Sequence, residues 1–233
     1  MTVSAISVII PALNERESIG QVVASLPWSL IAECVVVDNG STDGTDKVAR
    51  DAGARVVYAP QGYGSACKAG AEAALATSSI LVFLDGDGSD AVEFLPRLVE
   101  PIEQNSADFV LGSRIRGDAE AGSMLGSQIF AAHLVGFLIR MLQGVAYTDM
   151  GPFRAIRRST FRELPMSEMT YGWNLEMQIR AARQGLRIEE IPVDYRCRIG
   201  GVSKVSGNLR ASMKAAVRIL GVVCRIGLSR RPT

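Results

Sequence analysis

Short apolar runs alternate with amphipathic segments along the first 112 residues. Runs rich in β-branched residues occur at 6–10, 34–37 and 80–84, and each is followed by a stretch with Asp, Asn or Gly. Such runs are typical of buried strands. Two further runs, at 55–58 and 108–111, bring the predicted strands to five. The intervening segments predict helices at 18–26, 45–51, 65–77 and 91–104.

Strands that alternate with helices predict an α/β fold, with a mostly parallel sheet flanked by helices. In such sheets, ligands bind beyond the carboxyl ends of the strands. Three polar loops begin at that edge. We therefore expect one rim of the sheet to carry Asn14, Glu15, Asp38, Asp43, Asp85 and Asp87.

The second half of the chain is less regular. Its apolar positions predict helices at 122–142, 173–184 and 209–228, and strands at 153–156 and 186–193. Gly185 follows the second of these helices at the position that helix C-caps favour. The second half is therefore expected to be a mainly helical region.

Composition narrows the class of protein. The net charge is +1 and 48% of residues are hydrophobic, which indicates a folded globular protein without a nucleic-acid partner. The four cysteines lack zinc-ligand spacing, so we expect buried free thiols in a reducing compartment. The N-terminus lacks a signal-peptide pattern, and no apolar run approaches the length of about 20 residues that crosses a bilayer. These features predict a cytoplasmic protein.

The most informative polar segment follows the run at 80–84 and has the sequence D-G-D-G-S-D, from Asp85 to Asp90. Two carboxylates one residue apart at the end of a strand suit Mg²⁺ or Mn²⁺, which are held by one or two carboxylates and substrate phosphates. The alternative is a solvated turn, since Asp and Gly are turn formers. A calcium-binding EF-hand fits less well, because its closing glutamate position is Pro96 here.

Seven segments carry a family resemblance. Three of them resemble, in order and spacing, the family 2 glycosyltransferases with the GT-A fold: SVIIPALNERESI at 7–19, VVVDNGSTDGT at 35–45 and LVFLDGDGSD at 81–90. Four further segments resemble the dolichol-phosphate mannose synthase branch and its polyprenyl-phosphate relatives: GSRIRG at 112–117, TDMGPFRAIRRS at 148–159, YGWNLEMQIRAARQG at 171–185 and RIGGVSK at 198–204. The resemblance implies a single domain, with a nucleotide-sugar-binding half at 1–112 and an acceptor-side half at 113–233.

The resemblance also implies a donor site. In that family the first loop holds the nucleotide base, which suggests base contacts for Pro11, Leu13 and Glu15. Asp38 matches a base-contacting aspartate. Its neighbour, often a second acid in relatives, is Asn39.

The D-G-D segment matches the aspartates that flank the metal and the diphosphate. Asp85 and Asp87 are therefore the candidate metal ligands, with Ser89 as a further ligand. Gly86 lets a nucleotide approach the backbone closely. Asp87 is also a catalytic candidate, because a cation there would stabilise the leaving diphosphate. The implied cofactor is Mg²⁺ or Mn²⁺.

Basic residues complete the implied site. Arg114 matches an arginine near the reacting phosphates, and Arg198 and Lys204 match a basic pair on a loop that closes over the donor. Asp149 is the candidate general base if the acceptor is a neutral hydroxyl, whereas an anionic lipid phosphate needs none. Glu176 has either a catalytic role or a structural one, holding a loop or another side chain.

The resemblance implies inverting transfer of a hexose from a GDP- or UDP-sugar, with a polyprenyl or dolichyl phosphate as the leading acceptor. The segment GSMLGSQIFAAHLVGF lacks an arginine that many relatives place near the acceptor phosphate, and Gln128, Ile129 and Phe130 occupy that neighbourhood. This keeps transfer to a soluble or protein-bound hydroxyl open. A non-catalytic nucleotide-binding module is the further alternative. A nucleotidyltransferase is disfavoured, because the loop from Pro11 to Arg16 is not Gly-rich.

Two apolar helices have two interpretations each. In the terminal helix at 209–228, Arg210, Lys214 and Arg218 share one face, as in helices that lie on membranes. The same pattern suits a helix packed on the core. The segment at 125–142 is either a membrane-contacting helix or part of the core. Peripheral contact with the inner membrane face is thus one expectation.

Overall fold

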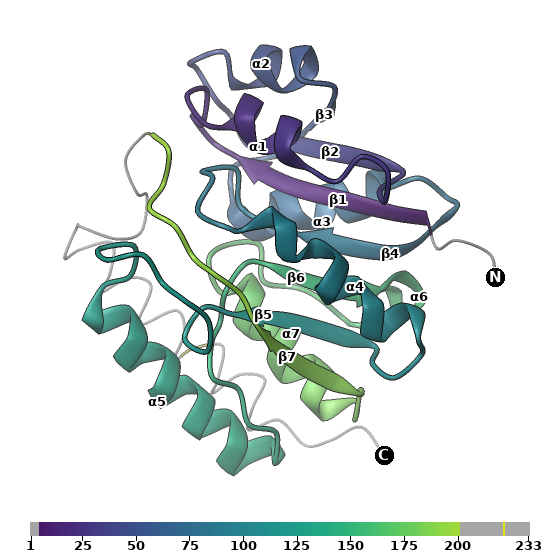
Figure 1. Ribbon diagram of the computed structural model, residues 1–233. Helices are drawn as coiled ribbons and strands as arrows, with labels where there is room; N and C mark the ends of the chain where they lie inside the picture. The colour runs from purple at the N-terminus through teal and green to yellow at the C-terminus, as the bar shows by residue number, and fades with distance from the viewer. Residues whose placement is uncertain (1–4, 201–220, 222–233) are drawn as a thin grey trace.

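The computed structural model describes residues 5–200 and residue 221. Lys204, Cys224 and the helix predicted at 209–228 lie outside these residues. Seven strands form one sheet in the order β3-β2-β1-β4-β6-β5-β7 (Figure 1). The strands are β1 (Ala5–Ala12), β2 (Glu33–Asp38), β3 (Arg55–Tyr58), β4 (Ser78–Phe83), β5 (Phe109–Ser113), β6 (Arg154–Arg157) and β7 (Ile188–Pro192).

The sheet is mostly parallel, as the sequence predicts. Strands β1 to β4 pair in parallel, and so do β5 and β7. Strand β6 runs antiparallel to β4 and β5, so a strand from the second half of the chain lies between two strands from the first. Both halves therefore contribute to one sheet.

Helices cover both faces of the sheet, which confirms the predicted α/β architecture (Figure 1). The helical segments are α1 (Ile19–Ser25), α2 (Thr45–Asp51), α3 (Tyr63–Ala73), η1 (Val92–Phe94), α4 (Leu95–Glu103), α5 (Gly126–Gln143), α6 (Arg158–Glu163) and α7 (Trp173–Arg183). One core cluster joins the sheet to α1, α2 and α4, and the other joins it to α3, α5 and α7.

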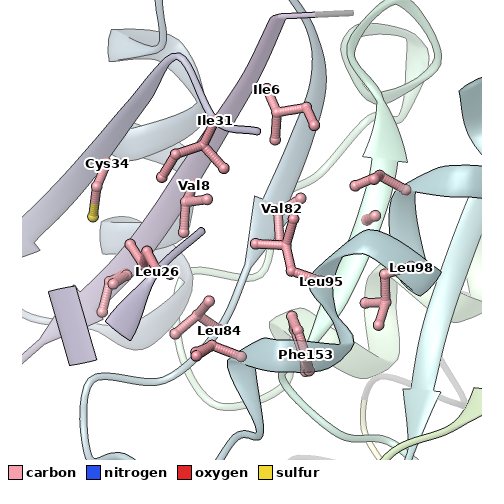
Figure 2. Close-up of a cluster of buried hydrophobic side chains, with 14 of the residues drawn as sticks. Ile6, Val8, Leu26, Ile31, Cys34, Val82, Leu84, Leu95, Leu98 and Phe153 are labelled. Carbon is pink, nitrogen blue, oxygen red and sulfur yellow. The ribbon is translucent and has the colours of Figure 1, made fainter. Parts of the chain in front are cut away.

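Alternation along the strands explains these two clusters. In β1, Ile6 and Val8 belong to the first cluster, whereas Ile9 belongs to the second. Figure 2 shows the first cluster, where Val8 lies near Ile31 and Leu26, and Val82 lies next to Leu95. Successive side chains of a strand point to opposite faces, so a strand with apolar residues at every position is buried on both sides.

Several predicted boundaries differ from the structure. The helix expected at 65–77 ends at Ala73, where Arg55 donates to the Ala73 carbonyl (2.6 Å) and Arg158 to the Ala74 carbonyl (3.0 Å). These distant arginines satisfy carbonyl groups that a longer helix would use. The short helix α6 was not predicted, because six residues without a cap give little local signal.

Prolines and glycines account for two further differences. The helix expected at 91–104 is divided into η1 and α4, with Pro96 in the first turn of α4. The helix expected from residue 122 starts at Gly126, because Gly122 has a φ of +87° and the Gln128 side chain accepts a hydrogen bond from the Leu125 amide (2.9 Å). That bond caps the helix at its observed start.

Helix α5 is apolar on two faces. Ala132, Val135 and Ile139 are buried, and the last two belong to the second core cluster. The opposite face exposes Phe130, Leu134, Phe137 and Met141, at intervals of four, three and four residues. In Figure 1 the helix lies at the margin of the molecule. The described part of the chain contains no helix with the length and hydropathy that crossing a bilayer requires.

The cysteines follow the expectation only in part. Cys34 and Cys67 are free and buried, as expected. Cys197 is free but exposed, so the prediction of a buried thiol is wrong at that position. It lies on the segment after β7, which packs at the rim of the sheet rather than within the core.

Candidate functional site

A cleft of about 800 Å³ opens at the carboxyl ends of the strands. Its walls come from the loops after β1, β2 and β4, from the start of α5, and from the segments around residues 170–174 and 195–198. The predicted site residues that line it are Pro11, Leu13, Glu15, Asn39, Asp85, Gly86, Asp87, Ser89, Arg114 and Arg198. Asp38 and Asp149 lie outside the described lining of the cleft.

Asp87 is held on both carboxylate oxygens. Its Oδ1 accepts hydrogen bonds from the amide (2.9 Å) and hydroxyl (2.5 Å) of Ser89. Its Oδ2 is paired with Nη2 of Arg198 at 2.5 Å. A cationic group therefore lies against the carboxylate that the sequence assigns to a metal ion.

Asp85 is held by a different set of partners. The Tyr63 hydroxyl donates to its Oδ1 (3.0 Å), and its backbone amide donates to Oδ2 of Asp90 (2.9 Å). Burial is the largest cause that raises the pKa of Asp85, and the negative charge of Asp87 is the next; the pKa is about 7. Burial and the charge of Asp85 raise the pKa of Asp90 well above its ordinary value. The carboxylates repel one another, so this rim of the cleft favours a bound cation.

The carboxylates at the cleft suit Mg²⁺ or Mn²⁺, but they do not form a complete metal site by themselves. Asp85 and Asp87 supply the one or two carboxylates with which these ions bind beside substrate phosphates. Within residues 5–200, no three His, Cys, Asp or Glu side chains come together as a complete metal-binding group. The geometry therefore suits an ion that substrate phosphates help to hold.

Arg114 and Asp149 form a bidentate ion pair. Nε of Arg114 donates to Oδ2 (2.7 Å) and Nη2 to Oδ1 (2.8 Å), and the Arg114 amide also reaches Oδ2 (3.0 Å). The Tyr195 ring lies against the guanidinium, 4.8 Å from its centroid. Burial alone would raise the pKa of Asp149, but hydrogen bonds and charge from Arg114 hold it below its ordinary value.

This pairing bears on the role of Asp149. A carboxylate with a lowered pKa and both oxygens occupied is a poor proton acceptor. The geometry therefore disfavours Asp149 as a general base. It favours a role in orienting Arg114, which does line the cleft.

Asp38 and Asn39 fix the loop after β2 through hydrogen bonds. Oδ1 of Asp38 accepts the amides of Gly40 (2.9 Å) and Ser41 (2.7 Å), and the residue is 3% exposed. Oδ1 of Asn39 accepts the Gly62 amide (2.9 Å) at the start of α3. Asp38 therefore shapes its own loop, while Asn39 joins that loop to α3.

The segment after β7 lies along the acidic loop. The Arg196 amide donates to the Ser89 carbonyl (2.9 Å) and the Ile199 amide to the Asp87 carbonyl (3.0 Å). Tyr195 forms an antiparallel bridge with Asp90. In Figure 1 this yellow-green segment leaves β7 and runs toward the loops at the rim of the sheet. The pairing brings Arg198 to Asp87.

Glu176 has a structural role of the kind that the sequence left open. It is fully buried and accepts the amides of Ser167 (2.9 Å) and Glu168 (2.6 Å), while Arg180 pairs with it at 2.7 Å. It therefore holds the loop that carries Thr170 and Tyr171 to the cleft.

Sequence reasoning missed several residues that line the cleft. Those with side chains suited to contacting a ligand are Gln61, Tyr63, Thr170, Tyr171, Asn174, Tyr195 and Arg196. One signal could have found Tyr63: it follows the strand at 55–58, whose carboxyl end lies at the same edge. The others depend on which loops of the second half reach this edge.

Comparison with known proteins identifies the family. The model of "Glycosyl transferase family 2" matches residues 7–165. An uncharacterised glycosyltransferase of Mycobacterium tuberculosis is 38% identical, over 96% of this chain and 100% of its own length. Undecaprenyl-phosphate mannosyltransferase of Micrococcus luteus is 32% identical, over 93% of this chain and 94% of its own.

A solved structure supports the same fold. Glucosyl-3-phosphoglycerate synthase from Mycobacterium tuberculosis, in complex with phosphoglyceric acid, superposes with a TM-score of 0.77 at 25% identity. The alignment covers 97% of this chain and 81% of that one. Its complex with Mn²⁺ and UDP-glucose gives a TM-score of 0.76, also at 25% identity, over 97% and 80% of the two chains. The chain therefore belongs to glycosyl transferase family 2 and has the GT-A fold.

Proposed function

We propose that this protein is a divalent-metal-dependent, inverting glycosyltransferase that moves a hexose from a nucleotide-sugar to a polyprenyl phosphate. The observation that carries the proposal is the arrangement at one rim of the cleft, where Asp85 and Asp87 lie with Arg114 and Arg198. Carboxylates that attract a cation, beside guanidinium groups that attract phosphates, form a site for a metal-bound diphosphate.

The donor half of the site follows from this arrangement. Pro11, Leu13 and Glu15 line the end of the cleft that we assign to the base, and the donor is a GDP- or UDP-sugar. Asp85 and Asp87, with Ser89, would hold Mg²⁺ or Mn²⁺, which would stabilise negative charge on the leaving diphosphate. The structural neighbour that binds Mn²⁺ and UDP-glucose supports this assignment.

The cationic side chains have distinct roles in the proposal. Arg114, fixed by Asp149, donates to the phosphates as charge develops on them. Arg198 turns from Asp87 toward the diphosphate when a cation occupies the carboxylate. We propose that Lys204, six residues further along the chain, contacts the acceptor phosphate. An anionic acceptor needs no general base, which agrees with the ion-paired state of Asp149.

The acceptor is the point on which the similar proteins differ. One is named for undecaprenyl phosphate and the other for phosphoglycerate, and both of these molecules carry a phosphate. The surface beside the cleft favours the lipid. Leu125 and Gln128, at the start of α5, line the cleft, and the exposed apolar face of that helix continues from them.

The exposed face of α5 suits a lipid chain and a membrane surface. Phe130 is 69% exposed, Phe137 58% and Met141 70%, in one stripe along the helix. Exposed apolar side chains in a continuous stripe mark a surface that is covered in the functional state. We propose that α5 rests on the membrane and that the polyprenyl chain leaves the cleft past Leu125.

A single-turnover assay tests the function. Labelled GDP- and UDP-sugars are incubated with Mg²⁺ or Mn²⁺, in parallel with polyprenyl phosphate, with phosphoglycerate and without acceptor. We expect one donor to be consumed only with the lipid phosphate, and Asp87→Ala to abolish consumption. Consumption only with phosphoglycerate would support a soluble acceptor instead. If no donor is bound or consumed under any condition, the enzymatic proposal fails.

A vesicle-binding assay tests the role of α5 separately. The double variant Phe130→Ser and Phe137→Ser should sediment with vesicles of anionic lipid several-fold less than the wild-type protein. The matched control is Trp28→Ser, which removes an aromatic residue that is 40% exposed on another part of the surface. Equal sedimentation of the wild-type protein and the double variant would contradict membrane contact through α5.

A further inference from the structure

Tyr63 occupies a fixed position at the start of α3. The preceding amide, of Gly62, donates to Oδ1 of Asn39 (2.9 Å), and the amide of Ser65 donates to the Met169 carbonyl (3.0 Å). Gly64 packs so closely on the loop at 168–169 that a Cβ atom would collide with its backbone. The first turn of α3 is thus held from both halves of the chain, and its tyrosine lines the cleft.

The hydroxyl of Tyr63 faces the carboxylate of Asp85 at the cleft. It donates to Oδ1 of Asp85 at 3.0 Å. The side chain of Asn174, from α7, lies near the same phenol.

Asn174 is itself held by a buried arginine. Nη1 of Arg154 donates to the Asn174 carbonyl (3.0 Å), and its guanidinium lies 5.9 Å from the centre of the Phe109 ring. Arg154 is fully buried and also donates to the carbonyls of Gly151 and Pro152. The start of α7 is therefore fixed relative to the loop before β6.

The geometry points to Tyr63 as a positioning residue that sets the orientation of the Asp85 carboxylate for the metal-bound diphosphate. Asp90 fixes the backbone amide of Asp85, and Tyr63 fixes its side chain. Partners of this kind orient metal-binding carboxylates and tune the affinity of the site. Asn174 lines the same cleft as Tyr63 and Asp85. The inference rests on the proposed function, because it assigns Asp85 to a cation site.

The test compares two tyrosine-to-phenylalanine variants. Tyr63→Phe removes the hydroxyl that faces Asp85. Tyr147→Phe is the matched control, because Tyr147 is 5% exposed and its hydroxyl donates to the Gln178 carbonyl (2.9 Å). Each variant loses one hydrogen bond of a phenol, which is buried in Tyr147 and partly buried in Tyr63, so their melting temperatures should fall by similar amounts.

The decisive measurement is the affinity for Mn²⁺, which electron paramagnetic resonance measures in the presence of UDP or GDP. We expect Tyr63→Phe to weaken Mn²⁺ binding about tenfold, the effect of losing a residue that orients a ligand, and Tyr147→Phe to change it less than about twofold. In turnover assays with an active donor, Tyr63→Phe should lower kcat more than it raises KM for the acceptor. A merely structural role for Tyr63 would leave the Mn²⁺ affinity unchanged.

Each outcome decides the question. If the wild-type protein binds Mn²⁺ with a nucleotide and Tyr63→Phe binds it equally well, the positioning role is wrong and the proposed function stands. If both variants weaken binding equally, the effect comes from global stability and the role is again wrong. If the wild-type protein binds no Mn²⁺ with either nucleotide, both proposals fail. Should Tyr63→Phe not fold, Asn174→Ala replaces it, with a smaller expected loss of Mn²⁺ affinity than Tyr63→Phe, and an unchanged affinity overturns the role.

Discussion

The two halves of this molecule position polar side chains in different ways. In residues 5–112, the site residues stand on loops that leave buried parallel strands, and the strands fix where the loops begin. In residues 113–200, the site residues are held by buried charged pairs, such as Arg114 with Asp149 and Arg180 with Glu176. The positions of the site residues depend on backbone pairing between strands in the first half, and on ion pairs between side chains in the second half.

The difference separates function from architecture. At the rim of the first half, burial and neighbouring carboxylates raise the pKa values of Asp85 and Asp90 above the ordinary value, so their charged forms are unfavourable there. Asp149 and Glu176 are stabilised by their partners, and their pKa values lie below the ordinary carboxylate value. Carboxylates whose pKa values are raised tend to lie in binding sites, whereas carboxylates stabilised by hydrogen bonds and ion pairs contribute to the stability of the fold. Substitutions should therefore affect activity most in the first group and stability most in the second.

The largest effect on stability is expected from Asp149→Asn. The substitution leaves Arg114 largely buried without its counter-charge, which should lower the free energy of unfolding by about 3 kcal/mol or more. Urea unfolding at pH 7 measures the change. Asp51→Asn is the control, because its pair with Lys47 is exposed and its loss should cost less than about 0.5 kcal/mol.

The same variant has a defined pH dependence. The pKa of Asp149 is lower in the folded protein than the value of about 3.9 in an unfolded chain. Its contribution is therefore complete well above that value and is lost as the pH falls through the folded pKa. The difference between wild-type protein and variant should shrink below about pH 4. A difference that persists at lower pH would contradict an electrostatic origin.

In the first half, Asp87→Asn should act on turnover rather than on the fold. We expect donor turnover to fall about a hundredfold or more, since a metal-binding and charge-stabilising group is lost. The unfolding free energy should change by less than about 1 kcal/mol, because Arg198 is partly exposed and solvent screens its pair with Asp87. Loss of folding with little effect on the turnover of the remaining native protein would reverse the comparison.

Two substitutions on α5 should separate its two faces. Ile139→Ala removes a side chain that is 1% exposed and should cost about 2–4 kcal/mol of unfolding free energy. Phe137→Ala, two residues earlier on the 58% exposed side, should cost less than about 0.5 kcal/mol. Chemical denaturation of the two variants measures both values. Equal losses would mean that the outer face packs against protein in the native state.

The smallest expected effect is a gain. The pKa of Asp90 is raised and its Oδ1 is buried without a partner in the described structure, so its charged form disfavours the fold. Such a group lowers stability as the pH rises from about 3.9 toward its folded pKa. Asp90→Asn should therefore stabilise the protein by about 1 kcal/mol at pH 8 and by less at pH 5.

Glu33→Gln is the counterpart of Asp90→Asn. Despite its burial, hydrogen bonds from Ser7, the Leu75 amide and Arg55 hold the pKa of Glu33 below its ordinary value. This substitution should destabilise the protein at pH 8, and thermal unfolding at both pH values compares the two variants. A loss of stability at pH 8 in Asp90→Asn as well would show that the charge of Asp90 is needed for the fold.

The sequence by itself determined the architecture of the first half. The segments at 45–51 and 55–58 have the predicted bounds, and the loops with Glu15 and Asp87 meet at one cleft as expected. These features are local, because hydrophobic periodicity and turn residues act over a few positions. The carboxyl edge of a parallel sheet then brings the loops together without further information.

Only the tertiary structure decided which side chains meet. Arg198 lies 111 residues from Asp87 along the chain, Asp149 lies 35 from Arg114, and Tyr63 lies 22 from Asp85. The end of α3 likewise depends on an arginine more than 80 residues away. No local pattern encodes such pairs, because each depends on the packing of whole elements and on the low dielectric that packing creates. For this reason the sequence predicted which charged and polar side chains lie at the site. The fold decided which of them are paired with each other and which are available to bind a ligand.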